Sequence, residues 1–322
     1  VAADIEIGAD NRIWIGTDPS PYGGVTITDR GGGRILYSDA GDSKTAWTIS
    51  HSVSVSNARG RVELACAPSN ANVVYGLVEN NRQLEAVVKT TNKGTSWTNM
   101  AEPNDDDNGI SASDFTRGQA TYDLIAAVDP NNANSLIVGG INLHRTTDGA
   151  STWSQISKWS NNPGMFGKPY SLVHADQHAI TYKPGNSNTV IFGTDGGVFF
   201  TNSVNTSATA DVIAARNNGY NVTQYYACAI SPTSSSNHFL AGSQDNGTQE
   251  YTSSGINSTT AKRGGDGAFC FIDQNEPNIQ IASYVYNTYN LYNGIGNTFS
   301  GTILNDQNSG SFINVADYDD NQ

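Results

Sequence analysis

Two histidines and an aspartate alternate in the segment "HADQH" and form the first candidate site. His174, Asp176 and His178 are separated by single residues, and alternate residues of a β-strand project from one face. Two imidazoles and a carboxylate on one face would suit a divalent transition metal. The alternative is structural, with the same side chains hydrogen-bonded to neighbouring turns. The sequence identifies no fourth ligand that would decide between the two.

Three aspartates beside glycines form the second candidate site. Asp195 in "TDGG" and Asp245 in "QDNG" follow strand-like segments at equivalent places, whereas Asp266 in "GGDG" precedes one. If equivalent loops meet around an axis, these carboxylates would surround a ligand or cation site. Ordinary turn chemistry explains the same residues, because Asp and Gly both favour turns. A carboxylate pair for glycoside hydrolysis is the third interpretation.

The acidic segment "NDDDNG" at 104–109 has the spacing of half a calcium loop. Asn104, Asp106 and Gly109 fit the first half, but Phe115 stands where the bidentate Glu is expected. We interpret the segment as a solvated acidic loop with incidental calcium binding. A divalent cation, calcium or a transition metal, is thus the only cofactor that the sequence suggests.

One pattern organises the whole chain: an apolar strand, a turn, and a second strand ending in Gly. Four-stranded sheets bury both faces by stacking around an axis, and propeller blades repeat about every 40–50 residues. We therefore predict an all-β chain, a β-propeller of four-stranded blades with six repeats visible. The six turns lie at Ala9, Pro68, Pro130, Pro184, Pro232 and Gln274, between 42 and 62 residues apart.

Composition supports an all-β chain and excludes some partners. Charged residues make up 15% of the 322 residues and Gly occurs 33 times, which favours short strands and tight turns over helices. The net charge of −13 disfavours nucleic acid as a partner. No apolar run approaches the roughly 18 residues that a membrane-spanning segment needs.

The three cysteines lie within apolar, strand-like segments. We interpret Cys66, Cys228 and Cys270 as small buried residues, with a Cys228–Cys270 disulfide as the alternative. An odd number leaves at least one thiol without a partner in this chain.

Two further segments share one motif, Ser/Thr-x-Asp/Asn-x-Gly/Ala-x-Ser/Thr-Trp. "TTNKGTSW" ends at Trp97, "TTDGASTW" ends at Trp153, and "SDAGDSKTAW" at Trp47 is a stretched copy. The motif resembles the Asp box of sialidases, sortilins and related propellers, a hairpin turn between the outer strands of a blade. The resemblance implies a structural role in which the Asp or Asn accepts backbone hydrogen bonds and the Trp packs on the blade. The residues concerned are Asn92, Gly94, Trp97, Asp148 and Trp153.

Residues 174–267 resemble a bacterial, exported subgroup of sortilin-like BNR-repeat proteins. The resemblance rests on "HADQHAI", "GTDGGVFFTNS", "GSQDNGTQEY" and "GGDGAFCFID", in that order. It implies a propeller, a secreted or cell-surface location and further domains of the same polypeptide. It implies no reaction. Xyloglucan-hydrolysing enzymes share the architecture, but their catalytic carboxylates match no position here, so we assign no catalytic residue.

Two functions remain open. The first is an exported, non-enzymatic propeller module that binds protein or glycan at the cell surface or serves extracellular assembly. The alternative is a polysaccharide-active glycoside hydrolase of the xyloglucanase-like type. In either case we expect the DGG and DNG loops and "HADQH" near the axis and the Asp boxes at the periphery.

The end of the chain predicts a longer protein. "FINVADYDDNQ" matches the strand and turn that open a repeat. We expect residues 1–322 to form one propeller whose intact form has at least seven blades.

Overall fold

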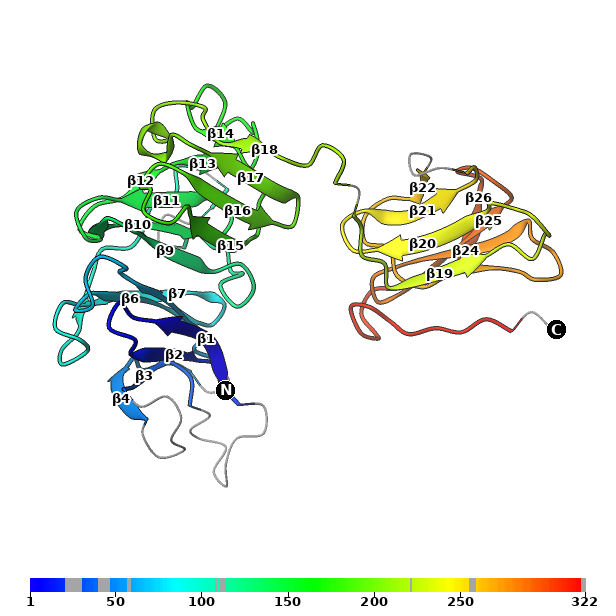
Figure 1. Ribbon diagram of the computed structural model, residues 1–322. Helices are drawn as coiled ribbons and strands as arrows, with labels where there is room; N and C mark the ends of the chain where they lie inside the picture. Colours follow the sequence, from blue (N-terminus) through cyan, green and yellow to red (C-terminus); the bar gives the residue numbers. More distant parts are fainter. Residues whose placement is uncertain are drawn as a thin grey trace. The chain divides into compact units, whose positions relative to one another are not determined.

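The structure, a computed structural model, describes residues 1–20, 31–39, 47–56, 59–107, 109–110, 114–220, 222–254 and 259–319. The chain divides into two compact units, Val1–Asn217 and Asn218–Gln322, coloured blue to green and yellow to red in Figure 1. Within the described ranges, helix is limited to one 3-10 turn, η1 (Val204–Thr206). The all-β prediction is confirmed.

The described part of the first unit contains four antiparallel sheets of four strands, each in simple up-and-down order. A short parallel ribbon, β13–β14, lies between the third and fourth sheets in the sequence. The strands are β1 (Ala2–Ile7), β2 (Ile13–Thr17), β3 (Arg34–Ser38), β4 (Thr48–Ser52); β5 (Val62–Cys66), β6 (Val74–Asn80), β7 (Gln83–Thr90), β8 (Thr98–Asn99); β9 (Ile125–Asp129), β10 (Asn132–Gly139), β11 (Leu143–Thr146), β12 (Ser154–Gln155); β13 (Ser157–Lys158), β14 (Ser171–Leu172); and β15 (Gln177–Tyr182), β16 (Val190–Thr194), β17 (Gly197–Thr201), β18 (Ala214–Ala215).

The described part of the second unit contains two sheets of the same kind. Their strands are β19 (Ala227–Ile230), β20 (Phe239–Ser243), β21 (Gly247–Tyr251), β22 (Thr259–Arg263); and β23 (Cys270–Ile272), β24 (Ile279–Tyr284), β25 (Asn287–Asn293), β26 (Phe299–Asp306).

Successive sheets stack through their first strands. In the first unit β1 contacts β5, β5 contacts β9, and β9 contacts β15; in the second, β19 contacts β23. All six predicted turns fall between the first and second strands of a sheet. Four-stranded up-and-down sheets stacked in this way are the blades of a β-propeller. The predicted fold class and its six repeats are therefore confirmed.

Apolar side chains fill the space between neighbouring blades. Trp14 and Ile35 of the first sheet pack with Val62 of the second. Ile137 of the third sheet packs with Phe192 of the fourth. The second and third blades carry apolar residues toward both faces because each is covered on both sides, whereas Ile5 and Ile7 of β1 are exposed.

A Gly near the end of the second strand has a packing reason in the first and fifth blades. A Cβ on Gly16 of β2 would lie 2.2 Å from the carbonyl oxygen of Val62 in the next blade. A Cβ on Gly242 of β20 would lie 1.9 Å from the carbonyl oxygen of Ala268. No side chain fits such distances, so Gly lets the next blade approach.

Candidate functional site

The first predicted group of site residues meets one member of the second, Asp195, at the start of β15 in the first unit. The His174 ring packs against Gly196, where an added Cβ would lie 2.2 Å from the ring. The backbone N–H of Asp195 donates to the carbonyl oxygen of Asp176 at 3.1 Å. The structure thus brings His174, Asp176, His178 and Asp195 together.

The segment "HADQH" is not a continuous strand, which corrects the geometry behind the metal prediction. Strand β15 begins at Gln177, and Asp176 precedes it in a left-handed bend with φ of 60°. The three side chains therefore do not alternate along one strand face. Across the described ranges of the chain, no three His, Cys, Asp or Glu side chains are placed to hold a metal ion. In this structure His174, Asp176 and His178 are not grouped as a ligand set, and a metal-binding role for them stays a prediction.

Asp195 is held by a histidine and a tyrosine. His178 Nε2 lies 2.5 Å from Asp195 Oδ1. The Tyr122 hydroxyl lies 3.0 Å from both carboxylate oxygens, and its ring meets the His178 imidazole edge-on at 4.6 Å between centroids. His178 and Asp195 are exposed, and Tyr122 is 52% exposed. This small surface carries an aromatic ring, an imidazole and a carboxylate in fixed positions.

Two more carboxylates lie behind Asp195. Asp176 is partly buried and accepts a hydrogen bond from Gln119 Nε2 at 3.3 Å. Burial and then the charge of Asp195 raise the pKa of Asp176. Asp123 is fully buried, and burial followed by the charge of Asp176 raises its pKa to about 8. Asp123 therefore carries a proton at neutral pH.

The acidic character continues along the first strands of the first two blades. Asp4 of β1 accepts a hydrogen bond from the backbone N–H of Leu64 in β5 at 2.8 Å. Burial and then the charge of Asp4 raise the pKa of Glu6 to about 7 and that of Glu63 to about 8. Arg61 donates to Glu63 at 2.9 Å.

Asp245 and Asp266 lie in the second unit. Asp245 stands in the β20–β21 turn, the same place in its sheet that Asp195 has in the β16–β17 turn. The backbone N–H of Asp245 donates to Asp266 Oδ1 at 3.0 Å. This hydrogen bond stabilises the turn. The ligand-binding role of Asp245 and Asp266 stays a prediction.

The two Trp-ended motifs form the same turn between the third and fourth strands of their blades. Asn92 Oδ1 accepts the backbone N–H of Ser96 at 2.9 Å, and Asp148 Oδ1 accepts that of Thr152 at 2.9 Å. Gly94 is left-handed, with φ of 80°, as the turn requires. These are the outer hairpins of the second and third blades. The stretched copy at Trp47 includes residues 40–46, which lie outside the described residues.

Each tryptophan of these turns reaches the preceding blade. Trp97 Nε1 donates to Ser50 Oγ at 2.9 Å, and Trp153 Nε1 donates to the carbonyl oxygen of Ala101 at 2.8 Å. Ser50 belongs to β4, and Ala101 follows β8. The turns therefore join successive blades at their outer strands.

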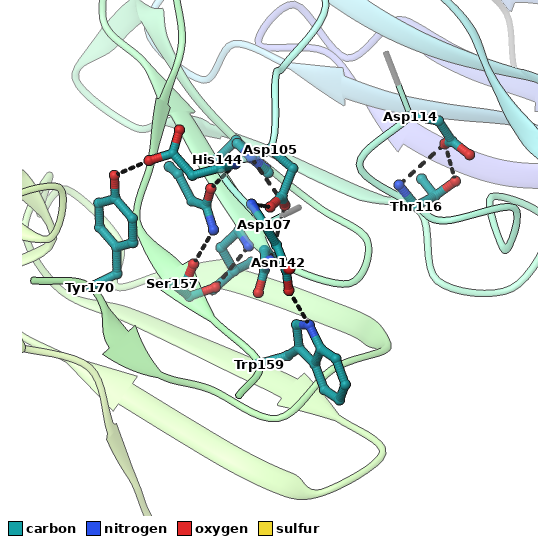
Figure 2. Close-up of polar contacts among 12 residues, drawn as sticks. Asp105, Asp107, Asp114, Thr116, Asn142, His144, Ser157, Trp159 and Tyr170 are labelled. Carbon is teal, nitrogen blue, oxygen red and sulfur yellow. Dashed lines mark hydrogen bonds and ion pairs between the residues drawn. The ribbon is translucent and has the colours of Figure 1, made fainter. Parts of the chain in front are cut away.

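The acidic segment 104–109 is only partly the solvated loop that the sequence predicts. Asn104, Asp106 and Gly109 are exposed, Asn108 lies outside the described residues, and two aspartates are buried. Asp105 is 7% exposed and Asp107 is 2% exposed. Asn142 Nδ2 donates to Asp105 at 2.9 Å and Trp159 Nε1 donates to Asp107 at 2.8 Å, as Figure 2 shows. Side-chain amide and indole donors replace water around these carboxylates. The aspartates anchor the segment to the third blade.

A fully buried histidine adjoins this segment. Asp105 Oδ2 lies 3.6 Å from His144 Nε2, and Phe115 packs edge-on against the imidazole. Burial lowers the pKa of His144 to about 4, so the ring is neutral at pH 7. No local pattern predicts this contact, because residues 105 and 144 meet only through the packing of the blade.

The cysteines are free. Cys66 and Cys270 are buried, as expected, whereas Cys228 is exposed. The alternative Cys228–Cys270 disulfide is absent from the structure.

Comparisons with known proteins place the chain near propellers only at low similarity. No family model and no curated protein matches the chain. A GH74 enzyme from Niastella koreensis aligns with 93% of this chain and 45% of its own, at 17% identity and a TM-score of 0.41. The GH74 xyloglucanase from Xanthomonas campestris aligns with 94% and 45%, at 13% identity and a TM-score of 0.39. The chain therefore spans less than half the length of these two proteins.

A different kind of propeller aligns equally well. YCF48 bound to D1 peptide aligns with 92% of this chain and 79% of its own, at 11% identity and a TM-score of 0.37. At such values none of these similarities assigns a function. No helix in the described ranges is long and apolar enough to cross a membrane.

Proposed function

We propose that this chain is an exported, non-enzymatic propeller module that binds a protein or glycan at the cell surface. One observation carries the proposal. Tyr122, His178 and Asp195 form an exposed, mutually bonded group beside the partly buried Asp176. Fixed polar and aromatic side chains at a surface are suited to recognition, because little side-chain entropy is lost on binding.

A glycoside hydrolase is the second candidate, and one feature favours it. The raised pKa of Asp123, about 8, keeps a proton on one of two neighbouring carboxyls, as a general acid requires. The burial of Asp123 argues against it, because a fully buried acid does not reach a glycosidic oxygen. Asp195 is also engaged by His178 and Tyr122. Binding without hydrolysis is the better account.

We further propose that the chain belongs to the sortilin-like, BNR-repeat propellers. The two matching turns at Asn92 and Asp148, with the same side-chain-to-backbone bonds, support Asp boxes at these positions. Export to the cell surface and further domains of the same polypeptide follow from that resemblance.

A glycan array combined with a polysaccharide-hydrolysis screen tests the function. We expect binding without release of reducing sugar, and a loss of about tenfold in affinity for Asp195→Asn, the value of one charge-assisted hydrogen bond. Asp211→Asn is the matched control, because Asp211 is exposed and precedes the outer strand β18. Xyloglucan or another polysaccharide cleaved by wild type and not by Asp195→Asn would establish the hydrolase instead.

A further inference from the structure

Four Asn-Gly pairs occur in the sequence, and three of them lie within the described residues. These three begin at Asn218, Asn246 and Asn293, whereas the fourth begins at Asn108, outside the described residues. The backbone nitrogen that follows an asparagine can attack its side-chain amide, and glycine permits this best because it has no Cβ to hinder the approach. The attack needs a nitrogen that is not engaged in a hydrogen bond and a main chain that can rotate. The fold therefore decides which pair reacts.

The pair at Asn293 is held by hydrogen bonds on both sides of Gly294. The Gly294 N–H donates to the carbonyl oxygen of Asn278 at 2.7 Å. The Gly294 carbonyl oxygen accepts a hydrogen bond from Lys262 Nζ at 2.6 Å. The nitrogen that would attack Asn293 is therefore engaged, and the main chain beside it is fixed.

The pair at Asn246 is held mainly by packing. Gly247 is buried at the start of β21, opposite Ser243 of β20. An added Cβ on Gly247 would lie 2.0 Å from the carbonyl oxygen of Arg263, so the main chain there lies directly against β22. Asn246 Nδ2 donates to the carbonyl oxygen of Gln244 at 3.2 Å. Bringing the Gly247 nitrogen to the Asn246 side chain would disrupt these contacts.

The pair at Asn218 has none of these restraints in the part of the chain that the structure describes. Asn218 and Gly219 form an exposed turn after β18, and no described residue accepts a hydrogen bond from the Gly219 N–H. Gly219 has φ of 77°, and an added Cβ would meet no atom within 4 Å. Asn218 is the first residue of the second unit, so the pair lies where the chain passes from one unit to the next.

We propose that Asn218 is a site of spontaneous deamidation, which converts it to isoaspartate. The Gly219 nitrogen bonds to Asn218 Cγ, and Nδ2 leaves as ammonia with the proton that the Gly219 nitrogen loses, so that a cyclic succinimide forms. Water then opens the ring at the main-chain carbonyl carbon of residue 218 to give isoaspartate, or at Cγ to give aspartate. Isoaspartate adds a methylene group to the main chain and a negative charge to the turn. This chemistry is independent of the proposed binding function.

Mass spectrometry of the full chain during incubation in mildly alkaline buffer tests the proposal. Alkaline buffer is used because the attacking nitrogen reacts after it loses its proton. Peptides from each time point report conversion at the three asparagines, and electron-transfer fragmentation distinguishes isoaspartate from aspartate. We expect Asn218 to convert at least about tenfold faster than Asn246 or Asn293, a difference of about 1.4 kcal/mol in the barrier, which one engaged hydrogen bond supplies.

The unfolded chain and three variants are the controls. In guanidinium chloride the three pairs should convert at similar rates, because the fold no longer distinguishes them. Gly219→Ala should slow conversion at Asn218, since its Cβ hinders the attack. Asn218→Gln should stop it, because the longer side chain would have to close a larger ring. Asn293→Gln is the matched control and should leave the rate at Asn218 unchanged.

Three results would overturn the proposal. The first is conversion at Asn246 or Asn293 as fast as at Asn218 in the folded chain. The second is an Asn218 that stays intact in the folded chain, whether or not the unfolded chain converts. The third is conversion of Asn218 to aspartate without isoaspartate, because direct hydrolysis of the side-chain amide would then replace the succinimide.

Discussion

Asp105, Asp107 and His144 show how a polar cluster becomes part of a core. Both carboxylates receive side-chain donors, and His144 is kept neutral by its burial. A buried neutral histidine stabilises the fold only while the solvent leaves it unprotonated. The pKa of His144 in the folded state, about 4, lies below its ordinary value of 6.5.

The first prediction follows from that difference. As pH falls below about 6.5, the unfolded chain takes up the proton before the folded chain does, so stability declines until the pH reaches about 4. The loss of this contribution is on the order of 3 kcal/mol. His144→Gln removes this contribution, so the free energy of unfolding of wild type minus that of the variant should decrease as pH falls across that interval.

Urea unfolding followed by tryptophan fluorescence measures the free energy of unfolding of wild type and His144→Gln at each pH. All five tryptophans lie in the first unit, which contains His144. Curves for wild type and His144→Gln should run parallel above pH 7 and converge or cross below it. Curves that stay parallel down to pH 4 would show that His144 is protonated in the folded protein.

The residues of the candidate site were only partly predictable. His174, Asp176, His178 and Asp195 stood out because their residue types and spacing are local features of the sequence. Tyr122 and Asp123 could not be predicted as site residues. They come from the segment before β9 and meet the residues at the start of β15 only when the third and fourth blades stack. Distant partners of this kind have no local pattern to reveal them.

Strands and hairpins were predictable because their signals are local. Proline, asparagine and glycine marked the turn between the first two strands of every blade, and apolar runs marked the strands themselves. The β13–β14 ribbon was missed because two-residue strands have no periodicity. The strand expected through "HADQH" failed because Asp176 adopts a left-handed conformation, which Asp tolerates.

The second prediction concerns the glycine that ends the second strand. Gly16→Ala places a Cβ 2.2 Å from the Val62 carbonyl oxygen, a backbone atom that cannot rotate away. We expect the free energy of unfolding to fall by roughly 1–3 kcal/mol, as overpacking does. Fluorescence-detected urea unfolding measures this change.

Gly193→Ala is the matched control. Gly193 holds the same place in β16, but an added Cβ there would meet Ala179 Cβ at 3.4 Å, an ordinary contact. Its stability should stay within about 0.5 kcal/mol of wild type, as for a neutral substitution. Equal destabilisation by both alanines would mean that the glycines matter through the strand backbone and not through the neighbouring blade.

At the scale of the molecule, a few buried acidic residues of the first unit determine how its stability depends on pH. The chain carries a net charge of −13, and most carboxylates can lie in water. Burial withdraws three carboxyl groups of the first unit from water and raises the pKa of each to between about 7 and about 8. They are Glu6, Glu63 and Asp123. The fold therefore keeps protons at neutral pH that the unfolded chain releases.

The sign of the resulting pH dependence is opposite to that of His144. Below about pH 4.5 these acids are protonated in both states and contribute no difference. As pH rises, the unfolded chain ionises first, so stability falls until the folded groups ionise near pH 8. These three acids outweigh the single opposing contribution of His144, so the four groups together should make the first unit less stable as pH rises from about 4.5 to 8.

Glu63→Gln tests the alkaline side of this curve. The amide cannot ionise, so the variant should match wild type near pH 5 and exceed it by roughly 1–2 kcal/mol at pH 8. Glu85→Gln removes the same charge from an exposed position on β7 of the same blade and controls for net charge. Urea unfolding at pH 5, 6, 7 and 8 measures all three proteins. If Glu63→Gln is instead less stable than wild type at pH 8, Glu63 is ionised in the folded chain and its ion pair with Arg61 outweighs the cost of burying its charge.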